Sequence, residues 1–503
     1  MMDVDLIRIL IVAGISLLLA KVLHIVAKWW LHHCYLRQRV PEPCKAHWLR
    51  GHLAADNRRA KETYLGYARK LPRMFRRQMG LFSTSVSVSH PETIADAMRA
   101  NPGKNELICK LFRAWLGNGL LISKGERWAR DHKLLTNVFS LDMRREYVGF
   151  YKEATSIMLD LWEGQPERWV DASQYFPNLT FDIILRCAMG AETNCQTERS
   201  PNSPAVRYET ALKDILLIVF QRLYKPWLLS NFIFYHLPIG RRFQKLLAET
   251  HEFSEQLISE RRTLLQKCSD KNDEENRRRD MLDVLLTARD EEGVGYSDTE
   301  VREHVETFLF AGHDTTSSAF QWAIHYLSLN TDVQERCRQE VLAVLEKCSG
   351  LDNFAHENLA ELEYLTQTIQ EVLRIANIVP YIAKTSKKPT QVDGISFPTG
   401  TNFQINIMGV HHSKEVWSDP DTFNPDRFSP DKVSRSSYAF IPFSCGPRAC
   451  LGKHFAMDEM KVVLSMILSK FRFVPDPLAE KPAWRMGLIV KPDPGVSVCL
   501  ELV

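Results

Sequence analysis

The 503-residue sequence lacks the features that would divide it into domains or tie it to several common ligand classes. Its eleven cysteines form no C-x-x-C pair and no zinc spacing, so they imply neither a disulfide framework nor a zinc site. A net charge of +3 is too small to indicate nucleic-acid binding. No linker splits the chain, whose 45% hydrophobic and 25% charged residues fit one large globular body. The scattered reduced thiols suggest that this body faces the cytosol.

Long apolar runs are also scarce, with one exception at the start of the chain. Residues 6–31 are mostly aliphatic and long enough to cross a membrane, although Arg8 and Lys21 interrupt them. Acidic residues precede the run and basic residues follow it, which places the C-terminal side in the cytosol. A cleaved signal peptide and an in-plane amphipathic helix are the alternatives. We expect a membrane anchor at 1–32, a proline-containing hinge at 33–47 and one large catalytic domain at 48–503.

The most specific pattern lies near the C-terminus, in the ten residues from 443 to 452. Cys450 is interpreted as the axial thiolate of a haem iron, because a thiolate donates electron density strongly to the metal. Gly446 permits a tight turn and Gly452 a close backbone approach. Phe443 can cover the apolar side of the loop, and Arg448 offers a fork of donors to a haem propionate. The run from 455 predicts a helix whose N-terminus favours the thiolate. The alternative is a buried structural thiol in a turn.

A second pattern predicts a helix of about 33 residues, or about 50 Å at 1.5 Å per residue. It starts at a capping box formed by Ser297 and Glu300 and carries an apolar face at helical spacing. In its centre, Ala311 and Gly312 would leave space for a planar cofactor and dioxygen, and a threonine hydroxyl can bond back to a carbonyl. An acid such as Asp314 is costly to bury unpaired. The alternative is an ordinary core helix with a few polar residues.

Together these motifs resemble the haem-binding signature and the oxygen-activating segment of the cytochrome P-450 superfamily. The resemblance implies a mainly α fold with small β-sheets, the cytochrome P-450 fold. It implies non-covalent haem b held by Cys450, with Asp314 and Thr315 positioning a water that delivers protons. Trp128 is expected at a haem propionate. His132 and Lys384 stand at positions where relatives usually carry arginine, and Lys384 loses the bidentate fork. Arg130 or Lys133 could replace the arginine missing at His132.

The same resemblance implies a structural group on the proximal side of the haem. Glu371 and Arg374 share a helix face at a spacing of three residues. Arg427 follows at the distance expected of the family and would complete a buried triad that retains the haem. Shorter patterns predict a strand near 83–89, a hairpin turning at Asp393-Gly394, a strand from 402 and a solvated loop at 269–280.

Several stretches resemble family 4 of these enzymes, including residues 115–121 and 312–316. Family 4 implies terminal (ω) or near-terminal hydroxylation of fatty acids and related lipids, in the endoplasmic reticulum membrane with one membrane pass. Electrons would come from NADPH through NADPH–cytochrome P-450 reductase, with cytochrome b5 as a second candidate donor, and O2 is consumed. Many relatives carry a glutamate esterified to the haem where this chain has Ala311, so strict ω-selectivity is weakened. Glu306 lies too far along the helix to replace it.

Two other functions remain open on the sequence alone. One is a haem-thiolate isomerase or dehydratase of lipid peroxides, which needs no reductase and no proton relay. The other is a non-enzymatic haem or lipid binder. A basic face for the reductase could include Arg127, Arg130, Lys133, Lys453 and Lys461, although ordinary solvated side chains explain them equally well.

Overall fold

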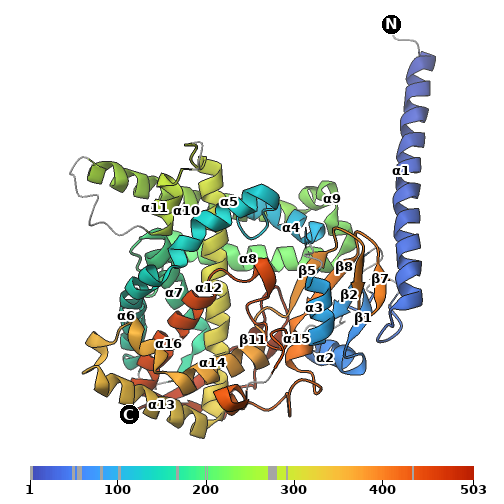
Figure 1. Ribbon diagram of the computed structural model, residues 1–503. Coiled ribbons are helices and arrows are strands. Elements are labelled where there is room, and N and C mark those ends of the chain that lie inside the picture. The colour runs from blue at the N-terminus through green and yellow to red at the C-terminus, as the bar shows by residue number, and fades with distance from the viewer. Residues whose placement is uncertain are drawn as a thin grey trace.

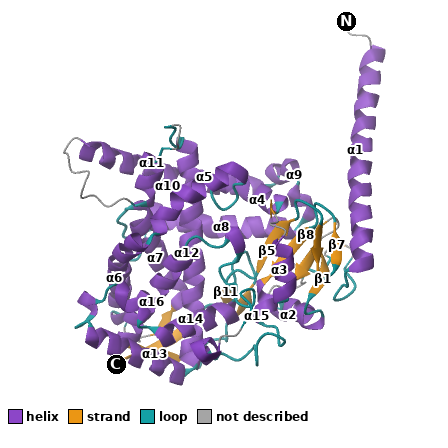
Figure 2. Cartoon of the chain, in the orientation of Figure 1, coloured by secondary structure: helices purple, strands orange, loops and turns teal. Residues whose placement is uncertain are grey.

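The structure, a computed structural model, is mainly helical with small sheets (Figures 1 and 2). It describes residues 4–47, 51–53, 59–79, 83–99, 103–165, 169–198, 200, 202–269, 280–289, 293–432 and 435–503. Its α-helices are α1 (Val4–Arg39), α2 (Ala60–Lys70), α3 (Pro91–Arg99), α4 (Glu106–Leu116), α5 (Gly125–Thr136), α6 (Leu141–Glu163), α7 (Ala172–Ile184), α8 (Pro204–Tyr224), α9 (Asn231–His236), α10 (Pro238–Ser269), α11 (Met281–Thr287), α12 (Asp298–Leu329), α13 (Thr331–Lys347), α14 (Glu363–Ala376), α15 (Ile407–His411) and α16 (Lys453–Lys470).

The strands form one larger sheet and three small ones. They are β1 (Met74–Met79), β2 (Ser83–Val88), β3 (Gly103–Lys104), β4 (Trp169–Asp171), β5 (Tyr381–Thr385), β6 (Thr390–Val392), β7 (Ile395–Phe397), β8 (Asn402–Asn406), β9 (Phe471–Pro475), β10 (Ala483–Arg485), β11 (Lys491–Asp493) and β12 (Ser497–Leu502). The five-stranded sheet has the order β1-β2-β8-β5-β3, in which only β2 and β8 pair in parallel. The three-stranded sheet has the order β4-β12-β9, while β10-β11 and β6-β7 are hairpin-like pairs.

Helix α12 crosses the helical part of the molecule, with α16 and α14 alongside (Figure 1). It covers 32 residues and starts at the predicted capping box, in which Ser297 and Glu300 satisfy each other's backbone N–H groups. Most of its side chains are buried, because helices pack on it from several sides. The prediction of a long central helix is therefore confirmed.

The predicted strands are also present. The hairpin turns at Asp393 and Gly394, both with positive φ, and Val392 pairs with Ile395 across it. This is the geometry that an Asp-Gly pair favours in a two-residue turn. The strands expected near 83–89 and from 402 are β2 and β8, which pair with each other. The charge run predicted as a loop lies, at 270–279, outside the described residues.

Two hydrophobic cores hold the body together. The larger one lies among the helices, and the smaller one underlies the five-stranded sheet. Leu36 and Val40, at the end of α1, belong to the sheet core, so this end of the helix is fixed to the body. Figure 1 shows the remainder of α1 leading away from the body toward the N-terminus.

Within the described residues, one helix, α1, is long and apolar enough to cross a membrane. The candidate span is Leu10–Arg39, whose most apolar 18-residue window has a mean hydropathy of 2.3. None of its most apolar window is buried against the protein, as expected of an anchor rather than of a core helix. The helix continues to Arg39 and therefore includes the first residues of the segment predicted as a hinge. Pro41 and Pro43 follow directly after its end, where prolines are tolerated.

Candidate active site

The loop that carries Cys450 is a tight turn followed by a helix. The Cys450 N–H donates to the Phe443 carbonyl oxygen at 2.9 Å, which closes the loop. Gly446 has φ +74°, where an L side chain is strained, and it starts a short 3₁₀ turn that runs to Arg448. Helix α16 then begins at Lys453, so its N-terminus lies beside the sulfur, as predicted.

The Cys450 sulfur is arranged to serve as a ligand. Cys450 is exposed on one side, but the protein atoms around its thiol remove much of its hydration and raise its pKa, whereas the Gly452 N–H donates to the sulfur and opposes that rise. A thiol with a raised pKa stays protonated at neutral pH unless a cation holds it as the thiolate, which is what a metal ion does. A Cβ added to Gly452 would meet only Phe139, at an ordinary 3.8 Å. The close approach predicted at the Gly452 backbone therefore does not involve another part of the described protein.

In the centre of α12, Ala311, Gly312 and Thr315 remain partly exposed while their neighbours are buried. The Thr315 hydroxyl donates to the Ala311 carbonyl oxygen at 2.9 Å, the predicted back-bond. Its oxygen keeps lone pairs that can accept from a water. Thr316 is instead buried and donates to the Gly312 carbonyl oxygen at 3.0 Å. Thr315 is therefore the threonine that faces the partly exposed side.

Gly312 also packs closely against another helix, which the sequence did not indicate. A Cβ at Gly312 would lie 2.6 Å from Ile184 Cδ1 at the end of α7. No real Cβ comes this close to a carbon atom, so an alanine at 312 would force the Ile184 side chain to move, and glycine favours the close packing of α7 on α12. Ala311 and Gly312 both remain partly exposed, so the space predicted beside them for a cofactor stays a prediction.

Asp314 is buried, with 4% of its surface exposed, and forms an ion pair with Lys491 of β11. The pair joins its Oδ1 to the lysine, while its Oδ2 is buried without a hydrogen-bond partner among the described residues. A buried carboxylate oxygen of this kind calls for a donor such as water. Sequence reasoning missed Lys491, because it lies on a strand 177 residues away.

The two halves of the site meet at Phe139, which follows α5. Its ring lies 5.8 Å from that of Phe308, one turn before Ala311, and 6.1 Å from that of Phe455 on α16. Phe139 is also the residue closest to the Cβ position of Gly452. The exposed face of α12 and the Cys450 loop therefore border the same aromatic side chain. Apart from its aromatic side chain, no sequence pattern pointed to Phe139.

Three cations gather beside the Cys450 loop: Lys104, Lys384 and Arg448. Lys104 on β3 and Lys384 on β5 are direct cross-strand partners, and Lys384 is only 3% exposed. The Arg448 guanidinium stacks 3.9 Å from the Trp128 ring and donates to the Ser123 carbonyl oxygen at 2.8 Å. Its Nη1 is buried without a partner. Lys384, Arg448 and Trp128 were predicted from the sequence, whereas Lys104 was not.

The positive charge of this cluster, Lys104-Lys384-Arg448, lacks a negatively charged partner among the described residues. Burial and the other two cations lower the pKa of Lys104 to about 8. Burial, and then Arg448, lower the pKa of Lys384, while burial lowers the pKa of Arg448 to about 10. In the part of the chain that the structure describes, no acid forms an ion pair with any of the three. Like charges placed opposite each other repel, so the cluster suits an anionic ligand. A soft sulfur ligand beside cations for carboxylates fits a haem with its propionates.

His132 lies beside Trp128, with ring centroids 4.9 Å apart, so this residue neighbours the cation cluster through the indole. Arg130, considered as a replacement for the missing arginine, is engaged elsewhere. It pairs with Asp131 and, at 3.0 Å, with Glu300 at the start of α12. Arg130 is therefore not available to a propionate.

The predicted basic face for a redox partner is smaller than the sequence suggested. Arg127 pairs with Glu303 at 2.6 Å, and Arg130 pairs as described above. Burial lowers the pKa of Lys461, which donates to the Leu359 carbonyl oxygen. Lys133 and Lys453 are the two candidates with exposed side chains. The local sequence around Arg127 and Arg130 could not reveal that both arginines pair with acids at the start of α12.

Glu371, Arg374 and Arg427 meet in the core. Arg374 donates two hydrogen bonds to the Glu371 carboxylate, of 2.7 and 2.8 Å, and Arg427 Nε donates to it at 3.0 Å. Glu371 and Arg374 are fully buried and Arg427 is 5% exposed. The remaining donors of Arg374 reach the carbonyl oxygens of His411 and Pro420. The geometry of the triad is thus the one that the resemblance implied.

Glu306 is fully buried away from the Ala311 position. Its carboxylate accepts hydrogen bonds from Ser254 at 2.6 Å, Trp115 at 2.9 Å and Tyr208 at 3.2 Å. Burial raises the pKa of Glu306 despite these donors. Its hydrogen bonds join four helices, so it serves packing and is not placed to replace a haem-linked glutamate.

Comparisons with known proteins agree with this geometry. The sequence model of the family described as cytochrome P-450 matches residues 41–500. Human cytochrome P-450 4X1 is 33% identical over 93% of this chain and 91% of its own length. Human cytochrome P-450 4F11 is 32% identical, and rat cytochrome P-450 4F3 is 34% identical, each over 98% of this chain and 95% of the relative.

Proposed function

Because the chain belongs to the cytochrome P-450 family and is a haem-thiolate monooxygenase, we propose that it hydroxylates a fatty acid or related lipid at or near its ω end. The observation that carries this proposal is the similarity to family 4 relatives over nearly the whole chain. The motifs on α12 and in the Cys450 loop agree with it. A fatty acid also suits an enzyme with an anchor, because such a substrate is concentrated in the membrane.

The proposed cofactor is haem b, bound through Cys450 and through propionate contacts to the cation cluster. When bound, the haem supplies the binding of O2 and the insertion of one oxygen atom into a C–H bond. Phe443 and Gly446 shape the loop that presents the sulfur, and Trp128 orients Arg448 by stacking. His132 takes part only through its contact with Trp128.

We propose that Asp314 and Thr315 deliver protons to the reaction. Lys491 holds Asp314 on one carboxylate oxygen and leaves the other for a water. The Thr315 hydroxyl, whose proton is committed to the Ala311 carbonyl, accepts from that water and positions it. Positioned proton transfer of this kind typically contributes about 10²–10⁴-fold to rate.

Ala311 sets a limit on regioselectivity. It cannot form the ester link that a glutamate makes with the haem, so the haem is held without a covalent bond in this chain. A less rigidly held haem gives a less strictly defined position of attack. We therefore propose a mixture of terminal and near-terminal hydroxylated products.

The proposed electron donor is NADPH–cytochrome P-450 reductase in the same membrane, with cytochrome b5 as a second donor. Lys133 and Lys453 are exposed candidates for contact with an acidic partner. The proposed location is the endoplasmic reticulum membrane, with α1 as the single pass and the body in the cytosol. The basic residues that follow the apolar run support this orientation.

The experiment is to incubate the full-length enzyme with reductase, NADPH and a mixture of fatty acids, and to identify products by mass spectrometry. We expect hydroxylated fatty acids that depend on NADPH. Oxygenation of steroids or small aromatics alone would overturn the lipid assignment. Turnover of lipid peroxides without reductase would favour an isomerase or dehydratase. Absence of NADPH consumption above background on a broad lipid panel would favour a non-enzymatic binder.

A further inference from the structure

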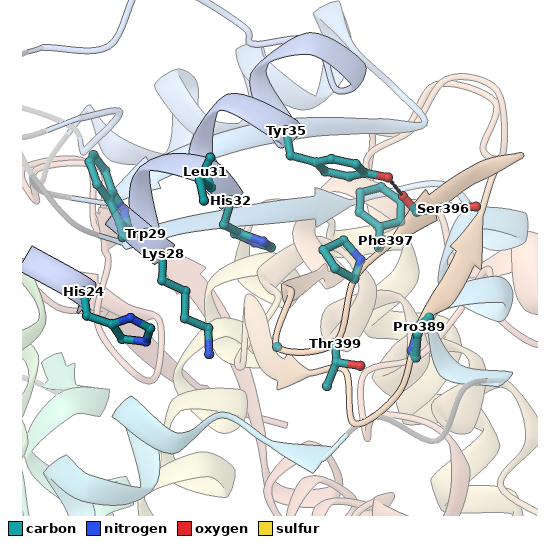
Figure 3. A pocket seen from close by; sticks show the side chains of 12 residues that line it. His24, Lys28, Trp29, Leu31, His32, Tyr35, Pro389, Ser396, Phe397 and Thr399 are labelled. Carbon is teal, nitrogen blue, oxygen red and sulfur yellow. Dashed lines mark hydrogen bonds between the residues drawn. The ribbon is translucent and has the colours of Figure 1, made fainter. Parts of the chain in front are cut away.

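A groove of about 960 Å³ lies between α1 and the β6–β7 hairpin with the residues that flank it. One wall is the helix, through residues between His24 and Tyr35, and the other is formed by Pro389 and residues 396–400 (Figure 3). It is separate from the Cys450 site, since none of its lining residues belongs to α12 or to the Cys450 loop. The proposed function gives this groove no role.

The helix side of the groove presents nitrogen donors. His24, Lys28 and His32 recur every four residues and therefore share one helix face. Figure 3 shows their side chains leaving the helix on the side of the segment that carries Thr399, whose hydroxyl adds a further donor. Among the described residues that line the groove, none carries a carboxylate. A set of donors without an acid is complementary to an anion.

The rest of the lining is apolar and held in place. Trp29, Leu31 and Phe397 contribute apolar surface to the walls. At the closed end, the Tyr35 hydroxyl donates to the Ser396 carbonyl oxygen at 2.6 Å. Just beyond it, Leu36 is buried in the sheet core, so the two walls have a fixed spacing there. The groove thus combines polar donors with apolar surface, as an amphiphilic ligand requires.

Its place along the helix puts the groove at the membrane surface. The apolar run begins at Leu6, and Lys28 comes 22 residues later. At 1.5 Å per residue these residues cover about 33 Å, close to the ~30 Å thickness of a hydrocarbon core. Trp29 and Trp30 stand where an interfacial aromatic belt is expected. Lys28 therefore lies at the level of the lipid headgroups.

We propose that this groove binds the headgroup of an anionic phospholipid from the leaflet around α1. Lys28 pairs with the phosphate, His24 and His32 donate to headgroup oxygens, and the apolar walls cover the start of the acyl chains. The bound lipid bridges α1 and the 396–400 segment, and so holds the body in one orientation on the membrane. The proposal rests on the membrane anchor and not on the identity of the substrate.

The test uses the full-length protein in nanodiscs made of phosphatidylcholine with a minor share of phosphatidylserine. Native mass spectrometry after release from the disc counts the lipids of each class that stay bound. The variants are Lys28→Gln, which removes the cation, and Thr399→Trp, which fills the groove without a change of charge. The matched control is Arg37→Gln, which removes an exposed cation of the same helix that does not line the groove.

We expect the wild type and Arg37→Gln to retain phosphatidylserine in preference to phosphatidylcholine. Lys28→Gln should retain about fivefold less, the effect of one lysine near an anionic surface. Thr399→Trp should lose the preference although its charge is unchanged. Equal losses in Lys28→Gln and Arg37→Gln, with none in Thr399→Trp, would show charge attraction without a site and overturn the proposal. Equal retention of both lipids by the wild type would also overturn it.

A second readout keeps the result independent of catalysis. Hydrogen exchange of the backbone at 396–400 should slow when phosphatidylserine is present, in the wild type and in Arg37→Gln but not in Lys28→Gln. Failure of the fatty-acid assay would leave this result unaffected. Failure of the protein to enter nanodiscs at all would instead contradict the anchor on which the proposal rests.

Discussion

In the described part of this monooxygenase, two groups of partly or fully buried cations can be compared, and they differ in whether the protein supplies the counter-charge. Arg374 and Arg427 share the carboxylate of Glu371, and the further donors of Arg374 reach backbone carbonyls. Lys104, Lys384 and Arg448 have no acid as partner among the described residues, and one Arg448 nitrogen is buried without an acceptor. The charges of the first group are paired within the protein alone. The charges of the second group would be balanced by an anionic ligand, such as the propionates of the haem proposed above.

The largest expected effect is at the triad of Glu371, Arg374 and Arg427, whose charges pair within the protein. Replacing Glu371 by Gln would leave two buried guanidinium groups without their counter-ion. Removing one partner of a buried ionic set typically costs about 3–5 kcal/mol, so we expect loss of most folded, haem-containing protein. The measurement is chemical denaturation followed by circular dichroism. The control is Glu361→Gln, which removes only an exposed carboxylate paired with Lys347. Wild-type stability of Glu371→Gln would show that the triad does not hold the fold.

A smaller effect is expected at the Lys104-Lys384-Arg448 cluster. Its sign differs between the stability of the haem-free protein and that of the haem-bound protein. Lys384→Met removes one of three mutually repelling cations, so the haem-free protein should be no less stable than the wild type. With haem bound, the variant lacks a charge-assisted hydrogen bond worth about 1.5–3 kcal/mol, and haem should dissociate about 10- to 100-fold faster. Transfer of haem to apomyoglobin measures this rate. The control is Lys387→Met on the neighbouring exposed loop, and equal rates in the two variants would contradict the assignment.

The pH dependence of haem retention sharpens the same comparison. The pKa of Lys104 is lowered to about 8, so this lysine loses its charge at a lower pH than an ordinary lysine. The anionic cofactor binds better to the charged form and raises that pKa in return. Haem loss should therefore accelerate as the pH rises from about 8 toward the ordinary pKa of lysine, about 10.4. The acceleration should be weaker in Lys104→Met, and identical profiles would remove Lys104 from the site.

Asp314 is intermediate between the two groups, since one of its oxygens is paired and the other is not. We expect Lys491→Met to leave the fold intact but to release Asp314 from its position. The share of consumed NADPH that appears as hydroxylated product should fall severalfold, with hydrogen peroxide rising in proportion, because mispositioned protons favour release of reduced oxygen. Thr315→Val should act in the same direction. Unchanged coupling in both variants would contradict the proposed proton delivery.

What the sequence could predict follows from how local each feature is. The Cys450 loop, the capping box at Ser297 and the Asp393-Gly394 hairpin are each encoded within a few consecutive residues, and they were predicted correctly. Lys104, Phe139 and Lys491 were missed, because their importance depends on contacts between segments far apart in the chain. The close packing of Gly312 on Ile184 was missed for the same reason, since Ile184 belongs to another helix. Arg127 and Arg130 looked like a solvated face until their partners on α12 were seen.

The most direct test of this account is the absorption spectrum of the reduced, carbon monoxide-bound protein with serine at position 450. Cys450→Ser should abolish the band of a thiolate-ligated haem, while Cys445→Ser, in the same loop, should keep it. If Cys450→Ser retained that band, the sulfur of Cys450 would not be the iron ligand and the site described here would be wrong.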